Sequence, residues 1–132
     1  IYRSAHYKPS WQAIAAPAPS GFGFAVACDP RDPQRAWFVP AHADVCRIPV
    51  DGRMVVTRTD DGGATFRVLA QGLPQSHAYH LVYRHALDVA GDGQTLAMAS
   101  TTGGLWVSAD AGETWQALSR DLPPVAVLRF AG

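Results

Sequence analysis

Residues 108–115 read Ser-Ala-Asp-Ala-Gly-Glu-Thr-Trp, and residues 59–66 read Thr-Asp-Asp-Gly-Gly-Ala-Thr-Phe. Both octapeptides place a hydroxyl side chain, an Asp, a Gly, a Thr and an aromatic ring at the same spacing, and the aromatic rings lie 49 residues apart. An internal repeat is therefore the first feature to explain. Its defining positions are Thr59, Asp61, Gly63, Thr65 and Phe66 in the earlier copy and Ser108, Asp110, Gly112, Thr114 and Trp115 in the later one.

A weaker third copy spans residues 4–11. Ser4 and Trp11 fit the pattern, whereas His6 and Lys8 replace the Asp and the Gly. A second landmark keeps the same register, because a proline follows eight residues after each aromatic ring, namely Pro19, Pro74 and Pro123. A period near 50 residues is typical of β-propellers, in which each repeat builds a four-stranded antiparallel blade.

Segments rich in β-forming residues lie between turn residues within each period. We predict strands at 23–28, 35–39, 54–59 and 66–71, and again at 84–89, 95–100, 105–109 and 115–119. Residues 11–15 predict the last strand of a preceding blade, and residues 125–130 the first strand of a following one. Proline and glycine punctuate the chain where helical repeats would need apolar residues at a spacing of 3.6.

The expected fold is therefore all-β, with two complete propeller blades and parts of two neighbours. The blades cover residues 21–74 and 75–124, with the outer strand of a preceding blade in 1–20 and the first strand of a next or closing blade in 125–132. Blades bury both flanks, so we expect the C-terminal part of a larger ring, or association of copies. A β-sandwich is the alternative, but sandwiches do not require a turn and a proline repeated in step.

Composition excludes several classes of protein. The 132 residues contain 11 basic and 11 acidic side chains, and a net charge of zero is a poor footprint for nucleic acid. With 48% hydrophobic and 17% charged residues the chain is not disordered. Its apolar stretches fall short of the about 18 residues needed to span a bilayer. Cys28 and Cys46 are expected at opposite ends of a blade, too far apart for a disulfide.

The octapeptides resemble the Asp-box, or BNR repeat, of sialidase-like β-propellers, and the phrase TDDGGATF is similar to repeats of uncharacterised bacterial propellers labelled as glycosyl hydrolases. The resemblance implies that each box forms the hairpin between the third and fourth strands of a blade. Aspartate can accept backbone N–H bonds there, glycine permits a positive φ, and threonine adds a local bond. We therefore expect the box residues to be structural rather than catalytic.

The face opposite the boxes is the candidate binding region. In a meander it carries the second-to-third and blade-to-blade loops, and the loop at 40–52 is 11 residues longer than its counterpart in the next blade. Arginine and histidine suit a carboxylate or phosphate, and tyrosine can stack on a sugar, so we expect a carbohydrate or small anionic ligand. The candidate ligand-binding residues are His42, Asp44, Arg47, Arg53, His77, Tyr79, His80 and Arg84.

A metal site is a weaker alternative in the same region. His42, Asp44 and Cys46 alternate, so a fully extended loop would present all three on one side, with His77 and His80 to complete the shell. Irregular loops rarely keep such alternation. We therefore predict no metal and no cofactor.

Three functions stay open at this level. The resemblance to sialidases implies an arginine triad, a tyrosine nucleophile paired with glutamate, and an aspartate acid/base. Arg47, Arg53 and Arg84 could supply arginines, but the one glutamate, Glu113, lies inside a box. We favour a ligand- or protein-binding scaffold, with a sialidase-like glycoside hydrolase, completed by other blades, as the alternative. The third candidate is a partner in the assembly of a membrane complex.

Overall fold

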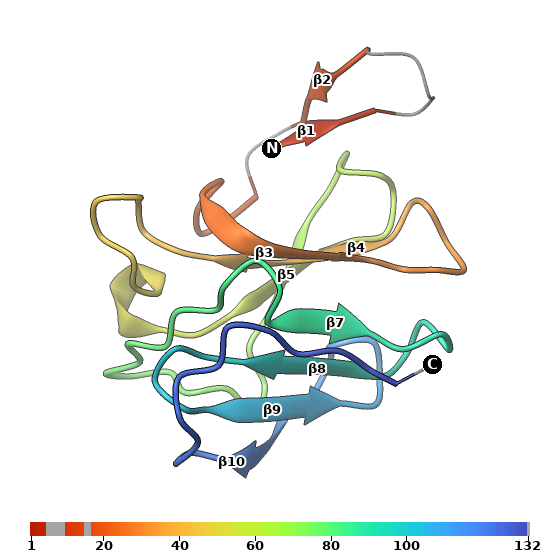
Figure 1. The fold of residues 1–132 in the computed structure, drawn as a ribbon. Helices are drawn as coiled ribbons and strands as arrows, with labels where there is room; N and C mark the ends of the chain where they lie inside the picture. The colour runs from red at the N-terminus through yellow and green to blue at the C-terminus, as the bar shows by residue number, and fades with distance from the viewer. Residues whose placement is uncertain (5–9, 15–16, 132) are drawn as a thin grey trace.

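The computed structural model describes residues 1–4, 10–14 and 17–131, which form three antiparallel sheets (Figure 1). In these residues the one helical element is the 3-10 turn η1 (Val50–Gly52), and no helix is long and apolar enough to cross a membrane. The first four-stranded sheet contains β3 (Gly23–Cys28), β4 (Ala36–Pro40), β5 (Val56–Thr59) and β6 (Arg67–Leu69). The second contains β7 (Leu87–Val89), β8 (Leu96–Ala99), β9 (Leu105–Ser108) and β10 (Gln116–Ser119), and a hairpin joins β1 (Tyr2–Arg3) to β2 (Gln12–Ala13).

Both four-stranded sheets are meanders in which each strand pairs with the next along the chain, as the predicted all-β blades require. The observed strand ends lie within three residues of the predicted ones. The predicted third strand at 54–59 begins later, at Val56, because the Met54 N–H donates to the carbonyl of Pro74 at 2.9 Å instead of joining the ladder.

Residues 125–130 do not form the predicted strand. Val127 makes one parallel bridge with His85, and the Leu128 N–H donates to the His85 carbonyl at 2.8 Å. The segment thus runs parallel to the approach to β7, where the first strand of a following blade is expected, but without a hydrogen-bonded ladder.

The β1–β2 hairpin shares its register with the two box hairpins. In each, the residue before the octapeptide pairs with the residue after its aromatic ring. The middle of the weak third copy, residues 5–9, and the end of the predicted strand at 11–15 lie outside the described residues. The equivalent pairs are Arg3 with Gln12, Arg58 with Arg67, and Val107 with Gln116.

The hydrophobic core lies between the two four-stranded sheets. Trp37 of β4 is fully buried and belongs to one cluster with Leu87, Leu96 and Met98 of the second sheet. Its indole Nε1 donates to the carbonyl of Ala111 at 2.8 Å, so the ring both packs and hydrogen-bonds across the interface.

The earlier octapeptide closes on itself through side-chain hydrogen bonds. The Thr59 hydroxyl donates to Asp61 Oδ1 at 2.9 Å and accepts the N–H of Gly63 at 2.8 Å. The Asp61 carboxylate also accepts the hydroxyl of Thr65 at 2.6 Å and its N–H at 2.9 Å. These bonds, that of the Thr65 hydroxyl foremost, lower the pKa of Asp61 to about 2.

The later octapeptide repeats this bonding within 0.1 Å. Ser108 donates to Asp110 at 2.8 Å and accepts the Gly112 N–H at 2.9 Å, and Asp110 accepts the N–H and hydroxyl of Thr114 at 2.9 and 2.6 Å. Burial opposes ionisation of Asp110, but the bonds from Thr114 and Ser108 outweigh it and lower the pKa. The aromatic ring that follows, Trp115, is buried and donates to the Gly112 carbonyl at 3.0 Å.

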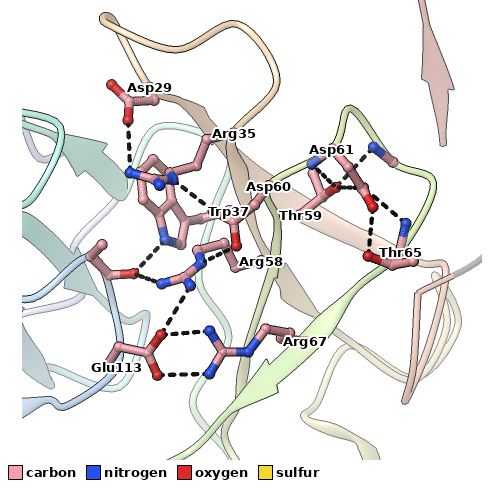
Figure 2. Close-up of polar contacts among 12 residues, drawn as sticks. Asp29, Arg35, Trp37, Arg58, Thr59, Asp60, Asp61, Thr65, Arg67 and Glu113 are labelled. Atoms are coloured by element: carbon pink, nitrogen blue, oxygen red, sulfur yellow. Dashed lines mark hydrogen bonds and ion pairs between the residues drawn. The ribbon is translucent and has the colours of Figure 1, made fainter.

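Ion pairs join the two sheets on the side of the boxes (Figure 2). Arg58 donates to Asp60, Glu113 and the Ala111 carbonyl, each at 2.9 Å. Arg67 donates two hydrogen bonds, of 2.7 and 3.0 Å, to the carboxylate of Glu113. These bonds are the main cause of the lowered pKa of Glu113. The one glutamate of the chain therefore braces the interface between the sheets.

We expect Ser108→Ala to lower the free energy of unfolding by about 1–3 kcal/mol, because it leaves the buried N–H of Gly112 without its acceptor. Ser108→Thr is the matched control, since threonine holds the same position in the earlier copy, and it should change stability little. Urea unfolding followed by circular dichroism checks both. Equal losses in the two variants would contradict the role given to the hydroxyl.

The second prediction concerns acid. The pKa of Asp61 in the folded protein is about 2, below its ordinary 3.8, so this carboxylate stabilises the fold fully above about pH 4 and the contribution is lost as the pH falls toward 2. Unfolding free energies between pH 5 and pH 2 should fall less steeply in Asp61→Asn and in Thr65→Val, which removes the donor hydroxyl. An unchanged slope in both variants would refute the assignment.

Candidate functional site

The turns and loops of the two sheets segregate to opposite faces. On one face the box hairpin meets the turn between the first two strands, where the Gly62 N–H donates to the Gln34 carbonyl at 2.8 Å. On the other face the loop after β4 meets the loop after β6, where the Ala78 N–H donates to the Gly52 carbonyl at 2.9 Å. The histidine-bearing loops thus lie away from the boxes.

These two loops enclose an open cleft of about 560 Å³. Four of the eight predicted ligand-binding residues line it, together with a carboxylate, an amide, a hydroxyl and a thiol. The residues with polar or aromatic side chains that line it are His42, Cys46, Asp51, Arg53, Gln75, Ser76, His77 and Tyr79.

Backbone bonds give the long loop after β4 a definite shape. Ala43 and Cys46 form a tight antiparallel bridge, and the His42 N–H donates to the Ile48 carbonyl at 2.8 Å. The chain then turns through η1, where the Arg53 N–H donates to the Val50 carbonyl at 3.0 Å. His42 and Arg53 are therefore carried at two fixed ends of a folded loop.

Two cleft residues have left-handed backbones. Asp51 has a φ of 54° and His77 a φ of 50°, and the one other non-glycine residue of this kind in the described chain is Ala111, in a box hairpin. A left-handed backbone costs a side-chain-bearing residue about 1–2 kcal/mol, and such strain gathers at binding sites. Two of the three such residues in the described chain therefore line the cleft.

Some polar groups of the cleft hold the loops together, and others are free to contact a ligand. The amide of Gln75 donates to the Met54 carbonyl at 2.7 Å and thereby ties the two loops together. Arg53 is exposed, and the described residues give it no ion-pair partner. Tyr79 exposes 56% of its surface. Arg53 and Tyr79 are thus free to meet a ligand.

Asp44 and Arg47 lie outside the cleft and bind each other. Arg47 donates to the Asp44 carboxylate at 2.7 Å and to its carbonyl at 3.0 Å, and its guanidinium lies 5.2 Å from the ring centre of Phe24. The prediction that they belong to the same site as His42 is not supported by this arrangement. Arg84 is also exposed, and it lines neither this cleft nor the hollow beside it in the described residues.

His80 occupies a neighbouring hollow of about 390 Å³, which shares residues 75–77 with the cleft. Its Nδ1 lies 2.6 Å from the Thr102 hydroxyl, and its ring meets Trp106 edge to face at 5.1 Å. Burial, with the charge of Arg120, lowers the pKa of His80. Sequence reasoning missed Trp106 and Arg120 because they lie in β9 and just after β10, outside the enlarged loops.

In the described residues, no three His, Cys, Asp or Glu side chains are arranged so that they could hold a metal ion. His42 and Cys46 reach the cleft, but Asp44 turns to Arg47 because the loop folds at the 43–46 bridge and loses its alternation. Both Cys28 and Cys46 are free thiols, as predicted.

Comparison with known proteins identifies the fold. No family model and no curated protein matches the sequence. Among solved structures, the chain is similar to a GH74 enzyme from Niastella koreensis, with a TM-score of 0.56 and 19% identity over 76% of this chain. It is similar also to the GH74 xyloglucanase from Xanthomonas campestris, with a TM-score of 0.58 and 24% identity over 80% of this chain.

The chain spans 15% of the length of each of these two structures. The GH74 enzymes are β-propeller glycoside hydrolases, and at these identities the likeness concerns the fold. The two four-stranded sheets are therefore blades of a β-propeller of the kind found in glycoside hydrolases.

We expect His77→Gly to raise the free energy of unfolding by about 1 kcal/mol, because glycine adopts the left-handed backbone of this position without strain. The exposed neighbour Ser76 has no such backbone, so Ser76→Gly is the matched control and should lower stability by about 0.5 kcal/mol. Denaturant unfolding measures both. A loss of stability in His77→Gly equal to that in the control would show that the backbone of His77 stores no strain.

Proposed function

We propose that this chain is part of an Asp-box repeat β-propeller that binds a carbohydrate carrying an acidic group, in the cleft between the loops after β4 and β6. The observation that carries the proposal is the presence of Arg53, without an ion-pair partner in the described residues, in the same cleft as the exposed ring of Tyr79. An arginine and an accessible aromatic ring suit the acidic group and the ring face of such a sugar.

The Asp-box assignment is supported by the bonding of the octapeptides. Asp61 and Asp110 each bind the hydroxyl and the N–H of the threonine four residues later, and both hairpins join the third and fourth strands of a blade. This is the position that the resemblance implies for the box. It gives both carboxylates a structural role, on the face away from the cleft.

The chemistry of the cleft favours binding. The guanidinium of Arg53 can donate two parallel hydrogen bonds to a carboxylate, while His42 and His77 offer ring nitrogens to hydroxyl groups. Hydrogen bonds from Gln75 and within η1 brace both loops. A preformed site loses less entropy when a ligand binds.

The glycoside hydrolase alternative is supported by the two solved neighbours, which are GH74 enzymes. Most glycosidases, sialidases excepted, flank the scissile bond with two carboxyl groups, about 5–5.5 Å apart in retaining and about 6.5–9.5 Å apart in inverting enzymes. Among the described residues, Asp51 is the one carboxylate that lines the cleft. Hydrolysis would thus require a second carboxylate from outside them.

Calorimetric titration with an acidic oligosaccharide, such as sialyllactose, and with a neutral one, such as cellotetraose, tests the proposal. We expect Arg53→Gln to weaken binding of the acidic sugar at least tenfold, since it removes a charge-assisted contact worth about 1.5–3 kcal/mol, and Tyr79→Ala to weaken both sugars. The controls are Arg84→Gln and Tyr2→Ala, which change an exposed arginine and an exposed tyrosine outside the cleft.

Failure of both sugars to bind would refute the proposal, as would equal losses in the Arg53 and Arg84 variants. The same preparations should be incubated with chromogenic glycosides. Turnover that Asp51→Asn abolishes would favour the glycoside hydrolase instead.

A further inference from the structure

Another pocket, of about 330 Å³, lies between the β1–β2 hairpin and the outer flank of the first four-stranded sheet, and it shares no lining residue with the cleft. The sheet contributes Val26 and Phe38 to its wall, and the hairpin contributes Arg3, Trp11 and Ile14. Apolar side chains therefore dominate it. Val26 exposes 49% of its surface and Trp11 67%.

At this pocket a box carbonyl accepts a hydrogen bond from an arginine. Between the two complete blades, the equivalent carbonyl accepts hydrogen bonds from both an arginine and a tryptophan. There, the carbonyl of Ala111 accepts both Trp37 Nε1 at 2.8 Å and Arg58 Nη1 at 2.9 Å. Gly62 is the residue equivalent to Ala111 in the earlier box, and its carbonyl accepts Arg3 Nη1 at 3.2 Å. Arg3 takes the place of Arg58, but in the described residues no indole takes the place of Trp37.

The packing around the two contacts is also equivalent. Leu69 of β6 lies against Gly112 of the later box, and Ile14, just after β2, lies against Gly63 of the earlier one. Both glycines have a positive φ, of 95° and 87°, which favours glycine, and a Cβ on Gly63 would also come within 2.6 Å of the Ile14 side chain. The hairpin thus sits on the first sheet as β5 and β6 sit on the second.

The strand register extends this equivalence to the walls. Phe38 of β4 pairs with Val26 as Met98 of β8 pairs with Leu87. Leu87 and Met98 are buried in one cluster with Trp37, whereas Val26 and Phe38 face the pocket. The flank that Trp37 covers on the second sheet is therefore the flank left open on the first.

The tryptophan and the arginine are retained or lost together in this chain. Trp37 lies directly opposite Arg58 in the β4–β5 ladder, and both donate to one carbonyl. In the second sheet the equivalent opposing pair is Ala97 and Val107, so both members are replaced. Because Arg3 is kept, its missing partner is expected to be a tryptophan.

We propose that the pocket binds an extended strand with the chemistry of β4, supplied by a further blade repeat, which pairs antiparallel with the open edge of β1. Its tryptophan lies opposite Arg3, fills the space between Val26 and Ile14, and donates its indole N–H to the Gly62 carbonyl. Strand addition of this kind combines main-chain bonds with one side-chain pocket, which sets specificity.

A synthetic peptide of residues 34–41, capped at both ends, serves as the probe, because this segment contains β4 and Trp37. Titrated into the ¹⁵N-labelled full chain, it should bind saturably and shift the amide signals of Arg3, Val26 and Gly62. A Trp37→Phe peptide keeps the apolar ring but lacks the N–H donor, so it should bind about fivefold more weakly.

Two protein variants test the location. Val26→Asp places a charge in the pocket wall and should abolish binding, whereas Val45→Asp, at a residue that is 98% exposed in the loop after β4, should leave it unchanged. Thermal unfolding verifies that both variants fold, and the Trp37→Phe peptide decides the question without any change in the protein. Absence of binding, equal affinity of the two peptides, or a pocket filled by a second copy of the chain in sedimentation experiments would overturn the proposal.

Discussion

One peptide carbonyl, that of Ala111, makes the central buried hydrogen-bonding contact between the two blades, beside the hydrophobic core and the ion pairs of Glu113. This carbonyl accepts the indole of Trp37 and the guanidinium of Arg58, both from the preceding blade. It can do so because the Asp110 carboxylate closes the hairpin around it, which holds Ala111 at a φ of 57°. The local hydrogen bonds of the octapeptide thus orient a group that acts between sheets. Without the hydrogen bonds between Asp110 and Thr114, the Ala111 carbonyl would be free to rotate. The blades would then lose the buried hydrogen bonds from Trp37 and Arg58.

On the face that carries the boxes, the carboxylates of Asp61, Asp110 and Glu113 are bound by other groups of the fold. Asp61 and Asp110 are saturated by their own hairpins, and Glu113 is shared between Arg58 and Arg67. Carboxylates held in this way have lowered pKa values and stay ionised, so they are unsuited to exchange protons near neutral pH. On the opposite face, Arg53 and Tyr79 are accessible in the cleft. The division of roles between the faces follows from the meander, which sends alternate connections to opposite ends of the strands.

Turn chemistry and repetition made much of the fold predictable. The octapeptides, the trailing prolines and the β-rich segments between them indicate the eight strands of the two blades, and each is found within three residues of its expected ends. Residues 125–130 were predicted wrongly as a strand, because a β-forming segment makes a ladder only when a neighbouring strand offers its edge. In the site, the exposed loop residues were predictable from loop length. The pairing of Asp44 with Arg47 was not, since it depends on how the loop bends at residues 43–46.

The sequence by itself determined the repeat, the register of the hairpins and the face on which the long loops emerge. These properties arise from interactions among residues close in the chain, so they can be predicted from the types and spacing of those residues. Only the tertiary structure decided that Arg3 and Arg58 reach equivalent carbonyls, that Asp51 and His77 share one cleft, and that Trp106 and Arg120 border His80. Such contacts join segments distant in the sequence. Their geometry is set by how one blade packs on another, because close packing leaves each side chain one place to lie.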